Sequence, residues 1–308
     1  MSRFPFLLIL FLFQASCTSI PDPSPPALDA EILAFQEKFV PDRRVARFDV
    51  DGVIKEDGML YLSGETTMPR VLDSLVEVLS AEGYELKNEV LSMPAAELGA
   101  DTFALARHSV VNLRSEKGHS QELATQVLLG TPLRVLKQDE EWFFVQCPDG
   151  YLAWVHGGEI VRMDAAELSA WKQADRLVFK PNAGHAYTEA NTTSRQVADL
   201  VAGDLLVRQA DLGRFTTVAF PDARTAYVPT AHLQPFSAWL AERKLNFALS
   251  KEIAFQQIGK PYFWGGTSPK AMDCSGFTKT VYWQQGLIIP RDASQQVHAG
   301  EPVNYDEE

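Results

Sequence analysis

The chain has 308 residues, which is enough for two or three domains at roughly 100–200 residues each. Hydrophobic residues make up 46% and charged residues 22%, a globular balance that excludes a disordered chain. The net charge of −12 argues against nucleic acid as a partner, because neutralising phosphates needs clustered Lys and Arg, and the sequence has no such cluster.

The first 17 residues have the pattern of an export signal. Phe4–Phe13 is an apolar run that is too short to span a bilayer but suits the core of a signal peptide. Small residues then precede Cys17, which resembles a bacterial lipobox, although Gln14 stands where leucine is usual. We therefore expect a lipoprotein-type signal over 1–17 and lipidation at Cys17, which would attach the protein to a membrane of the cell envelope. Simple secretion is the alternative. Residues 18–27 are rich in proline and are predicted to form an extended tether.

Residues 28–109 are predicted to form a small α/β unit. Apolar residues follow a helical spacing in two stretches, and two strand-like runs lie between them. No motif in this unit carries chemistry, and we interpret it as a packing or spacer domain. The elements expected, in chain order, are a helix over 29–39, strands over 47–54 and 59–63, and a helix that begins near Pro69 and is closed by Gly83.

The middle of the chain contains an internal repeat. Leu128–Ile160 aligns with Val201–Leu233 without a gap, at an offset of 73. Short alternating strands separated by frequent turns are typical of small β-barrels, and a repeat this regular indicates duplicated domains. We predict barrels over 110–162 and 179–235 and helical linkers over 163–178 and 236–246.

Both copies resemble bacterial SH3 (SH3b) domains. The stretch VVNLRSEKGHSQELATQVLLGTPLRVL matches the opening of that family, and Trp142 and the terminal YLAWV fit its later part. The resemblance implies modules that bind cell-wall peptides or brace a neighbouring catalytic domain. Trp142, Tyr151 and Trp154 have barrel core as their alternative role, because aromatic residues in small β units usually pack.

The stretch GKPYFWGGTSPKAMDCSGF contains the residue with the clearest chemical signal, Cys274. A helix that ends at Gly259 precedes it, and Asp273 has the character of an N-cap for the next helix. Cys274 therefore falls in the first turn of a helix, where unpaired backbone N–H groups and the helix dipole favour a thiolate. Cys147 lies in a strand pattern, and we interpret it as a buried, inert thiol rather than a disulfide partner.

Asp273 opposes this effect, because a carboxylate beside a thiolate favours the protonated thiol. Its position makes most sense if it faces a cation, such as the free amine of a bound peptide. The alternative is that Asp273 acts only as a helix cap.

Residues Ile253–Val303 resemble the first half of an NlpC/P60 domain, a papain-like cysteine peptidase. The aromatic-x-Trp-Gly-Gly segment, the Asp-Cys-Ser-Gly-Phe motif and PRDASQQ match in order. The fold expected for the whole chain is therefore α+β and multidomain: a small α/β unit, two SH3b-like barrels, and the N-terminal half of a papain-like domain over 247–308. The resemblance implies cleavage of peptidoglycan stem peptides between γ-D-glutamate and the diamino acid, with no metal or other cofactor.

The same resemblance assigns roles to individual residues. Cys274 would attack the γ-glutamyl carbonyl, and Tyr262 would support the developing oxyanion. The remaining positions would contact substrate: Asp273 and Ser275 at its amine, Trp264 as a wall, Glu116 and Tyr151 from the first SH3b copy, and Asp292 and Ser294 at the rim. For Asp292 and Ser294 the alternative is a capped turn before a helix.

None of the six histidines matches the general base of the family. His298 follows PRDASQQ closely, and His119 and His156 lie in the first SH3b copy. We expect the base to lie beyond Glu308, and therefore expect this chain alone to be inactive and to leave an apolar face of Phe277, Val281 and Tyr282 uncovered. The alternative function is an anchored SH3b protein that binds stem peptides and carries a degenerate peptidase half. A third hypothesis is a structural spacer of the envelope.

Overall fold

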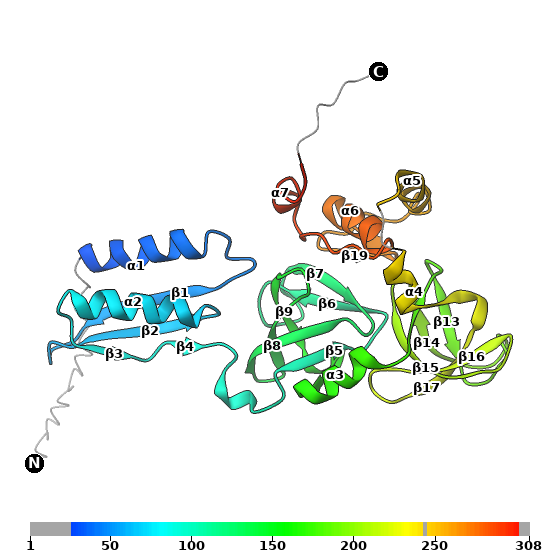
Figure 1. Cartoon of the computed structure of the whole chain (residues 1–308), viewed down its shortest axis with the longest axis horizontal. Helices are drawn as coiled ribbons and strands as arrows, with labels where there is room; N and C mark the ends of the chain where they lie inside the picture. Colours follow the sequence, from blue (N-terminus) through cyan, green and yellow to red (C-terminus); the bar gives the residue numbers. More distant parts are fainter. Residues whose placement is uncertain (1–25, 243–244, 302–308) are drawn as a thin grey trace, which may run out of the picture.

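The computed structural model describes residues 26–242 and 245–301 as an α+β protein built from several units (Figure 1). An N-terminal α/β unit lies at one end, two β units follow it, and the C-terminal segment, residues 247–301, lies across the β units. The predicted signal and Cys17 fall outside the described residues. None of the described helices combines the length and apolarity that a membrane crossing requires.

The N-terminal unit, residues 26–92, is a sheet with both of its helices on one face (Figure 1). The two predicted helices and the two predicted strands are confirmed. The helix expected from residue 29 begins at Pro26 and takes up the end of the predicted tether, because the first turn of a helix does not use the N–H that proline lacks. The elements are α1 (Pro26–Phe39), β1 (Phe48–Ile54), β2 (Leu60–Thr66), α2 (Pro69–Ala81), β3 (Leu86–Asn88) and β4 (Leu91–Ser92).

Strands β1 and β2 are antiparallel, and the short strands β3 and β4 both pair parallel to β2. The core of this unit lies between the sheet and the helices. Leu75 and Leu79 of α2 meet Phe48, Leu60 and Leu62 of the sheet, and all five are essentially without solvent contact. Burying each such side chain contributes about 1.5–3 kcal/mol, so this unit has a core of its own.

The first β unit is a seven-stranded sheet with the order β11-β5-β8-β9-β10-β6-β7. Its strands are β5 (Phe103–Ala106), β6 (Val110–Arg114), β7 (Leu123–Leu128), β8 (Pro132–Asp139), β9 (Trp142–Gln146), β10 (Leu152–His156) and β11 (Ile160–Met163). The predicted boundary at 110 is too late, because β5 pairs with both β8 and β11 and so belongs to this sheet.

The second β unit repeats the first strand for strand, and read from β18 its order β18-β12-β15-β16-β17-β13-β14 is the same. Its strands are β12 (Arg176–Phe179), β13 (Gly184–Tyr187), β14 (Gln196–Leu200), β15 (Leu205–Asp211), β16 (Phe215–Ala219), β17 (Thr225–Pro229) and β18 (Leu233–Pro235). The offset of 73 therefore extends back to β5 and β12. The predicted start at 179 is too late, because β12 pairs with β15 and β18 and so belongs to this sheet. The predicted linker 163–178 does contain a helix, over 165–173, but it also includes most of β12.

Two helices connect the units. Helix α3 (Ala165–Gln173) opens with a capping box formed by Asp164 and Glu167, and α4 (Phe236–Ala241) follows the second β unit. Trp171 and Trp239 from these helices are buried between the two units. The repeated sequence motif SAW therefore supplies core packing at both junctions.

The C-terminal segment rests on the first β unit. It contains α5 (Phe247–Phe255), β19 (Thr267–Ser268), β20 (Ala271–Met272), α6 (Cys274–Trp283) and α7 (Ala293–Gln296). Thr267 and Gln126 join the two parts by three hydrogen bonds: Gln126 N donates to Thr267 Oγ1 at 3.0 Å, Thr267 N to Gln126 Oε1 at 3.0 Å, and Thr267 Oγ1 to Gln126 O at 2.8 Å. The first β unit thus fixes the hairpin that leads into α6.

Candidate active site

Cys274 is the first residue of α6, and its side chain is exposed. Asp273 caps the helix in an extended backbone conformation, and its Oδ1 accepts a hydrogen bond from Gly276 N at 2.7 Å. The predicted helix start and N-cap are both confirmed. The thiol therefore sits at the positive end of a helix, where an anion is stabilised.

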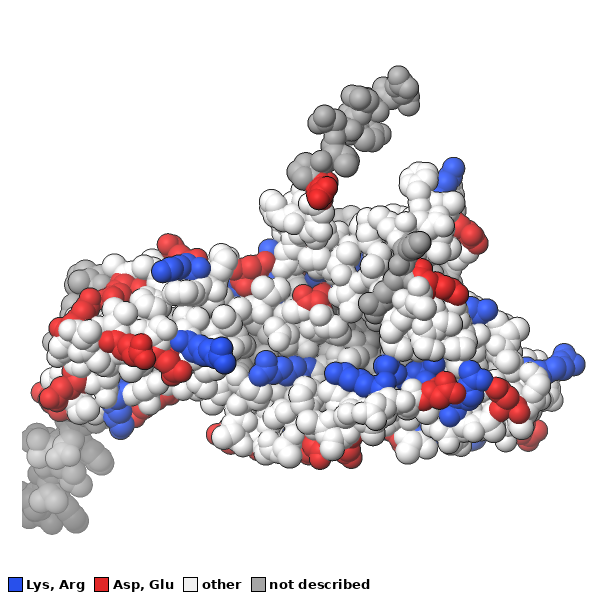
Figure 2. All heavy atoms as spheres, viewed as in Figure 1, with Lys and Arg blue, Asp and Glu red and all other residues white. Residues whose placement is uncertain are grey.

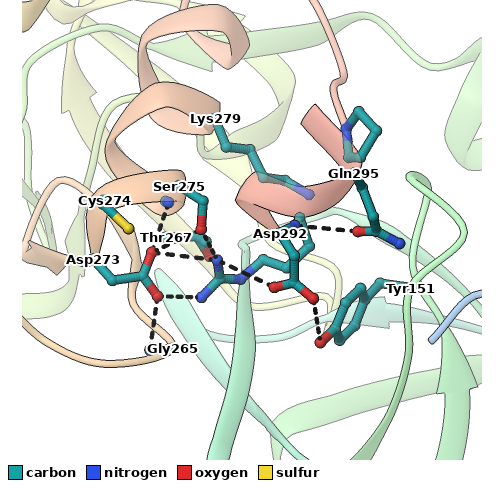
Figure 3. A network of polar contacts seen from close by, with 12 residues as sticks. Tyr151, Gly265, Thr267, Asp273, Cys274, Ser275, Lys279, Asp292 and Gln295 are labelled. Carbon is teal, nitrogen blue, oxygen red and sulfur yellow. Dashed lines mark hydrogen bonds and ion pairs between the residues drawn. The ribbon is translucent and has the colours of Figure 1, made fainter. Parts of the chain in front are cut away.

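The cation that Asp273 faces in the described part of the chain is Arg291. Arg291 Nη2 lies 2.6 Å from Asp273 Oδ2, and the two side chains are only 2% and 6% exposed (Figure 3). Asp273 Oδ2 also accepts from Gly265 N at 3.0 Å. Burial alone would raise the pKa of Asp273, but the Arg291 guanidinium and the N–H groups of Gly276 and Gly265 outweigh it and hold this pKa below its usual value.

The ion pair between Asp273 and Arg291 reduces the repulsion that the Asp273 carboxylate would otherwise exert on a Cys274 thiolate. The carboxylate next to the thiol is balanced by a buried guanidinium, so it opposes the thiolate far less than an unpaired charge would. Both oxygens of Asp273 have partners within the chain. The role expected for Asp273, binding a substrate amine, stays a prediction.

Ser275 is also turned inward. Its Oγ accepts from Arg291 Nη1 at 2.8 Å and donates to Asp273 Oδ1 at 3.2 Å, and its carbonyl accepts from Gln296 Nε2 at 3.0 Å. Ser275 therefore helps Arg291 to fix the start of α6. No local pattern identifies Arg291, which lies on a different stretch of chain, although it belongs to the PRDASQQ segment.

An exposed aromatic run, Tyr262 to Trp264, lies before the Gly-Gly loop. The backbone of Tyr262 pairs with Met272, two residues before Cys274, and Tyr262 and Trp264 are 64% and 63% exposed. Trp264 Nε1 donates to Glu122 Oε1 at 2.6 Å. The acidic side chain that reaches this wall from the first β unit is thus Glu122, whereas Glu116 is exposed on the same loop.

Residues 259–307 match the family described as NlpC/P60, and residues 113–159 match the bacterial dipeptidyl-peptidase Sh3 domain. The C-terminal segment belongs to the NlpC/P60 family. It is called the NlpC/P60 segment below.

Three known proteins show how far the similarity extends. A gamma-D-glutamyl-L-lysine dipeptidyl-peptidase of Bacillus cereus is 49% identical over 241 residues, which cover 70% of this chain and 66% of that protein. Dipeptidyl-peptidase 6 of Lysinibacillus sphaericus is 26% identical over 193 residues, 60% of this chain and 70% of that protein. A solved NlpC/P60 family protein from Bacillus cereus shares the fold with a TM-score of 0.58 at 18% identity, over 66% of this chain and 78% of its own.

Glycines let the NlpC/P60 segment approach the first β unit closely. Gly265 has φ of +80°, and a Cβ on it would lie 2.1 Å from Leu123 O. Gly259, on the same segment, has a similar φ of +84°, but a Cβ on it would meet no atom within 4 Å. The two positions therefore separate backbone strain from steric clash.

We expect Gly265→Ala to lower the free energy of unfolding by about 3 kcal/mol, since a left-handed residue costs about 1 kcal/mol and forced overpacking about 1–3 kcal/mol more. Gly259→Ala should cost only the contribution of about 1 kcal/mol that comes from the left-handed backbone conformation. Urea unfolding of the two variants measures both values. Equal losses would show that the contact with Leu123 is not tight.

Asp292 and Ser294, which were predicted to line the rim, lie close to Tyr151, the residue predicted to contact substrate from the first SH3b copy. Tyr151 Oη donates to Asp292 Oδ2 at 3.3 Å, and burial followed by the charge of Asp292 raises the pKa of Tyr151. Asp292 also forms the capping box of α7. Arg44 of the N-terminal unit, which the sequence did not single out, contacts both Asp292 and Ser294.

Other predicted positions are placed as follows. Cys147 is buried, and burial raises its thiol pKa, in agreement with an inert role. Trp142 and Trp154 are core residues of the first β unit. His119 and His156 pack on each other and on Trp142, with ring centroids 5.0 Å apart in the histidine pair. His298 is exposed after α7, so the base stays unassigned.

The predicted apolar face of α6 is only partly exposed. Val281 is 6% exposed, because α6 packs against α5 and β19, while Phe277 is 37% exposed. On the face shown in Figure 2 the NlpC/P60 segment carries few charges, whereas acidic side chains gather over the N-terminal unit. Exposed apolar residues of the segment also include Phe247, Phe255, Ile258 and Val297.

Proposed function

We propose that this protein is a cysteine endopeptidase of peptidoglycan stem peptides that cleaves the bond between γ-D-glutamate and the diamino acid. The observation that carries the proposal is an exposed thiol, Cys274, at the start of a ten-residue helix, beside a carboxylate balanced by buried Arg291. The substrate class is proposed from the relative named a gamma-D-glutamyl-L-lysine dipeptidyl-peptidase.

In the proposed reaction the Cys274 thiolate attacks the γ-carbonyl carbon of D-glutamate. The carbon–nitrogen bond then breaks, and the diamino acid leaves as an amine after taking a proton from a general acid. Water attacks the resulting thioester, gives up a proton to the general base, and releases Cys274 as a thiolate. An imidazole is the group expected to carry these protons.

Hydrolysis of L-Ala-γ-D-Glu-L-Lys by a form of the protein that includes the expected histidine base, followed by mass spectrometry, tests the proposal. Every turnover comparison requires this form, because the chain without that base is expected to be inactive. Release of L-Ala-D-Glu that depends on Cys274 supports it. A chain that binds the peptide but does not cleave it supports the alternative, an SH3b protein that recognises cell-wall peptides. If neither binding nor release occurs with this peptide or its diaminopimelate analogue, the proposal is wrong.

Tyr262 is proposed to donate to the developing oxyanion. Tyr262→Phe should therefore lower kcat by about 10²-fold with little change in KM, because the donor acts only as negative charge develops. Tyr187→Phe in the second β unit is the matched control and should leave kcat unchanged. Equal kcat values for the Tyr262 variant and the wild type would remove this residue from the mechanism.

We also propose that Cys17 is lipidated and anchors the protein at the cell envelope. In cells fed a radiolabelled or alkyne-tagged fatty acid, the protein should carry the label, and Cys17→Ser should lose it and move from the membrane fraction to the soluble fraction. An unlabelled wild-type protein in the soluble fraction would instead favour simple secretion.

A further inference from the structure

We infer that Arg44 is a positioning residue through which the N-terminal unit fixes the part of the NlpC/P60 segment that supports Cys274. The sequence predicts only a packing or spacer role for this unit. In the structure, the loop between α1 and β1 reaches residues 291–296, the stretch that carries Arg291. The inference rests on the proposed function only for its kinetic consequence, since its geometry is independent of turnover.

Arg44 holds the 291–296 stretch at two points. Its Nη1 lies 2.9 Å from Asp292 Oδ2 and donates to Ser294 Oγ at 2.8 Å. The remaining nitrogens, Nε and Nη2, each donate to Asp42 at 2.8 Å. All three nitrogens of the guanidinium are therefore engaged, and the fork has one defined orientation.

Asp42 adds a third link. Its Oδ2 accepts from Gln295 Nε2 at 2.8 Å. The hydrogen bond from Arg44, opposed by burial and assisted by Gln295, lowers the pKa of Asp42 to about 2, so this carboxylate stays ionised at neutral pH. Two residues of one loop thus contact three side-chain partners around α7.

The loop itself is fixed from the other side by the first β unit. Arg44 O accepts from Leu152 N at 2.7 Å, and Val45 O accepts from Gln146 Nε2 at 3.0 Å. Because these two hydrogen bonds attach the backbone of the loop to the first β unit, the Arg44 side chain links the first β unit to the 291–296 stretch. Tyr151, next to Leu152, donates to the same Asp292 oxygen.

The 291–296 stretch connects directly to the start of α6. Arg291 contacts Asp273 and Ser275 (Figure 3). Gln296 Nε2 donates to Ser275 O at 3.0 Å and to Pro290 O at 2.9 Å. A displacement of residues 291–296 would therefore move the start of α6 and change the position of the Cys274 thiol. Because the Arg44 and Asp292 side chains are 39% and 29% exposed, their pair contributes little to global stability, and its effect should be local.

Hydrogen exchange of the full chain, followed by mass spectrometry, tests the inference with Arg44→Ala and Arg43→Ala. Arg43 is the adjacent arginine, and its ion pair is with Asp49 inside the N-terminal unit. In Arg44→Ala we expect amides of 295–297 to exchange about fivefold faster, the gain expected from losing a partly exposed ion pair. In Arg43→Ala they should exchange at the wild-type rate, and both variants should keep the wild-type Tm within a few degrees.

Arg44→Lys should restore part of the protection, because a lysine can reach one partner but not form the fork. Turnover by the Arg44→Ala protein should show reduced kcat/KM while Arg43→Ala does not. Equal exchange at 295–297 in the two alanine variants overturns the inference. Faster exchange in Arg44→Ala together with no turnover by a wild-type form that includes the expected histidine base would sustain the inference and reject the proposed function.

Discussion

Replacing Cys274 by serine should lower kcat for stem-peptide cleavage by at least about 10⁴-fold, because removal of a nucleophile leaves only binding and oxyanion stabilisation. Serine keeps the size of the side chain and can form the same helix start, so the Tm should not change. Cleavage of L-Ala-γ-D-Glu-L-Lys and a thermal melt on the same sample measure both quantities.

Cys147→Ser is the matched control for this loss. Cys147 is buried in the core of the first β unit, so a hydroxyl there should cost stability of about 1–3 kcal/mol while leaving kcat unchanged. If Cys274→Ser keeps more than a tenth of the wild-type rate, Cys274 is not the nucleophile.

Arg291→Met is expected to give the largest loss of stability. Methionine matches the length of the arginine stem but leaves the Asp273 carboxylate buried without its cation, which typically costs about 3–5 kcal/mol. The same variant should react more slowly with iodoacetamide at Cys274, since the unbalanced carboxylate then opposes the thiolate. Urea unfolding and alkylation rates measure the two effects.

The double variant Asp273→Asn/Arg291→Met separates loss of the ion pair from loss of packing. It removes both charges while Asn can still cap α6, so it should be more stable than Arg291→Met alone. If the double variant is less stable than the single one, the buried charge of Asp273 is not the source of the loss.

The ion pair also predicts a pH dependence. Since the pKa of Asp273 is lowered in the folded state, its contribution to stability is fully present above the unfolded value of about 4 and is lost as pH falls through the lower folded value. The wild type should therefore lose more stability than the double variant as the pH falls below about 4. Parallel curves would contradict the assigned pKa shift.

Local features of the site follow from the sequence. The N-cap at Asp273 and the helix start at Cys274 each depend on a few neighbouring residues, and both lie where the pattern predicts them. The preceding helix ends at Phe255 rather than at the predicted Gly259, because the chain continues from 256 to 259 as a turn. The burial of Trp142 and Trp154 agrees with the tendency of aromatic residues in small β units to pack, and Cys147 follows a strand that is buried on both faces.

The partners of these residues do not follow from local patterns, because they come from distant stretches of chain. Arg291 and Asp273 meet only when α6 and the 291–296 stretch pack together, and Arg44 reaches Asp292 across 248 positions. Glu122 rather than Glu116 contacts Trp264 because loop geometry, not residue type, decides which carboxylate reaches the wall.

The first strand of each β unit, β5 and β12, was missed although the sequence contains a signal for it. The repeat offset that aligns the later strands also aligns β5 with β12, so extending the alignment backwards would have predicted both. The short strands β3 and β4 have no comparable signal. They have three and two residues and exist because β2 offers an edge for pairing.

The rate of Cys274 alkylation by iodoacetamide, measured at pH 7 beside free glutathione, is the most direct test of the thiolate on which the proposed chemistry depends. A helix start with a balanced neighbouring carboxylate predicts a rate at least about tenfold above that of glutathione. A rate equal to or below that of glutathione would contradict it.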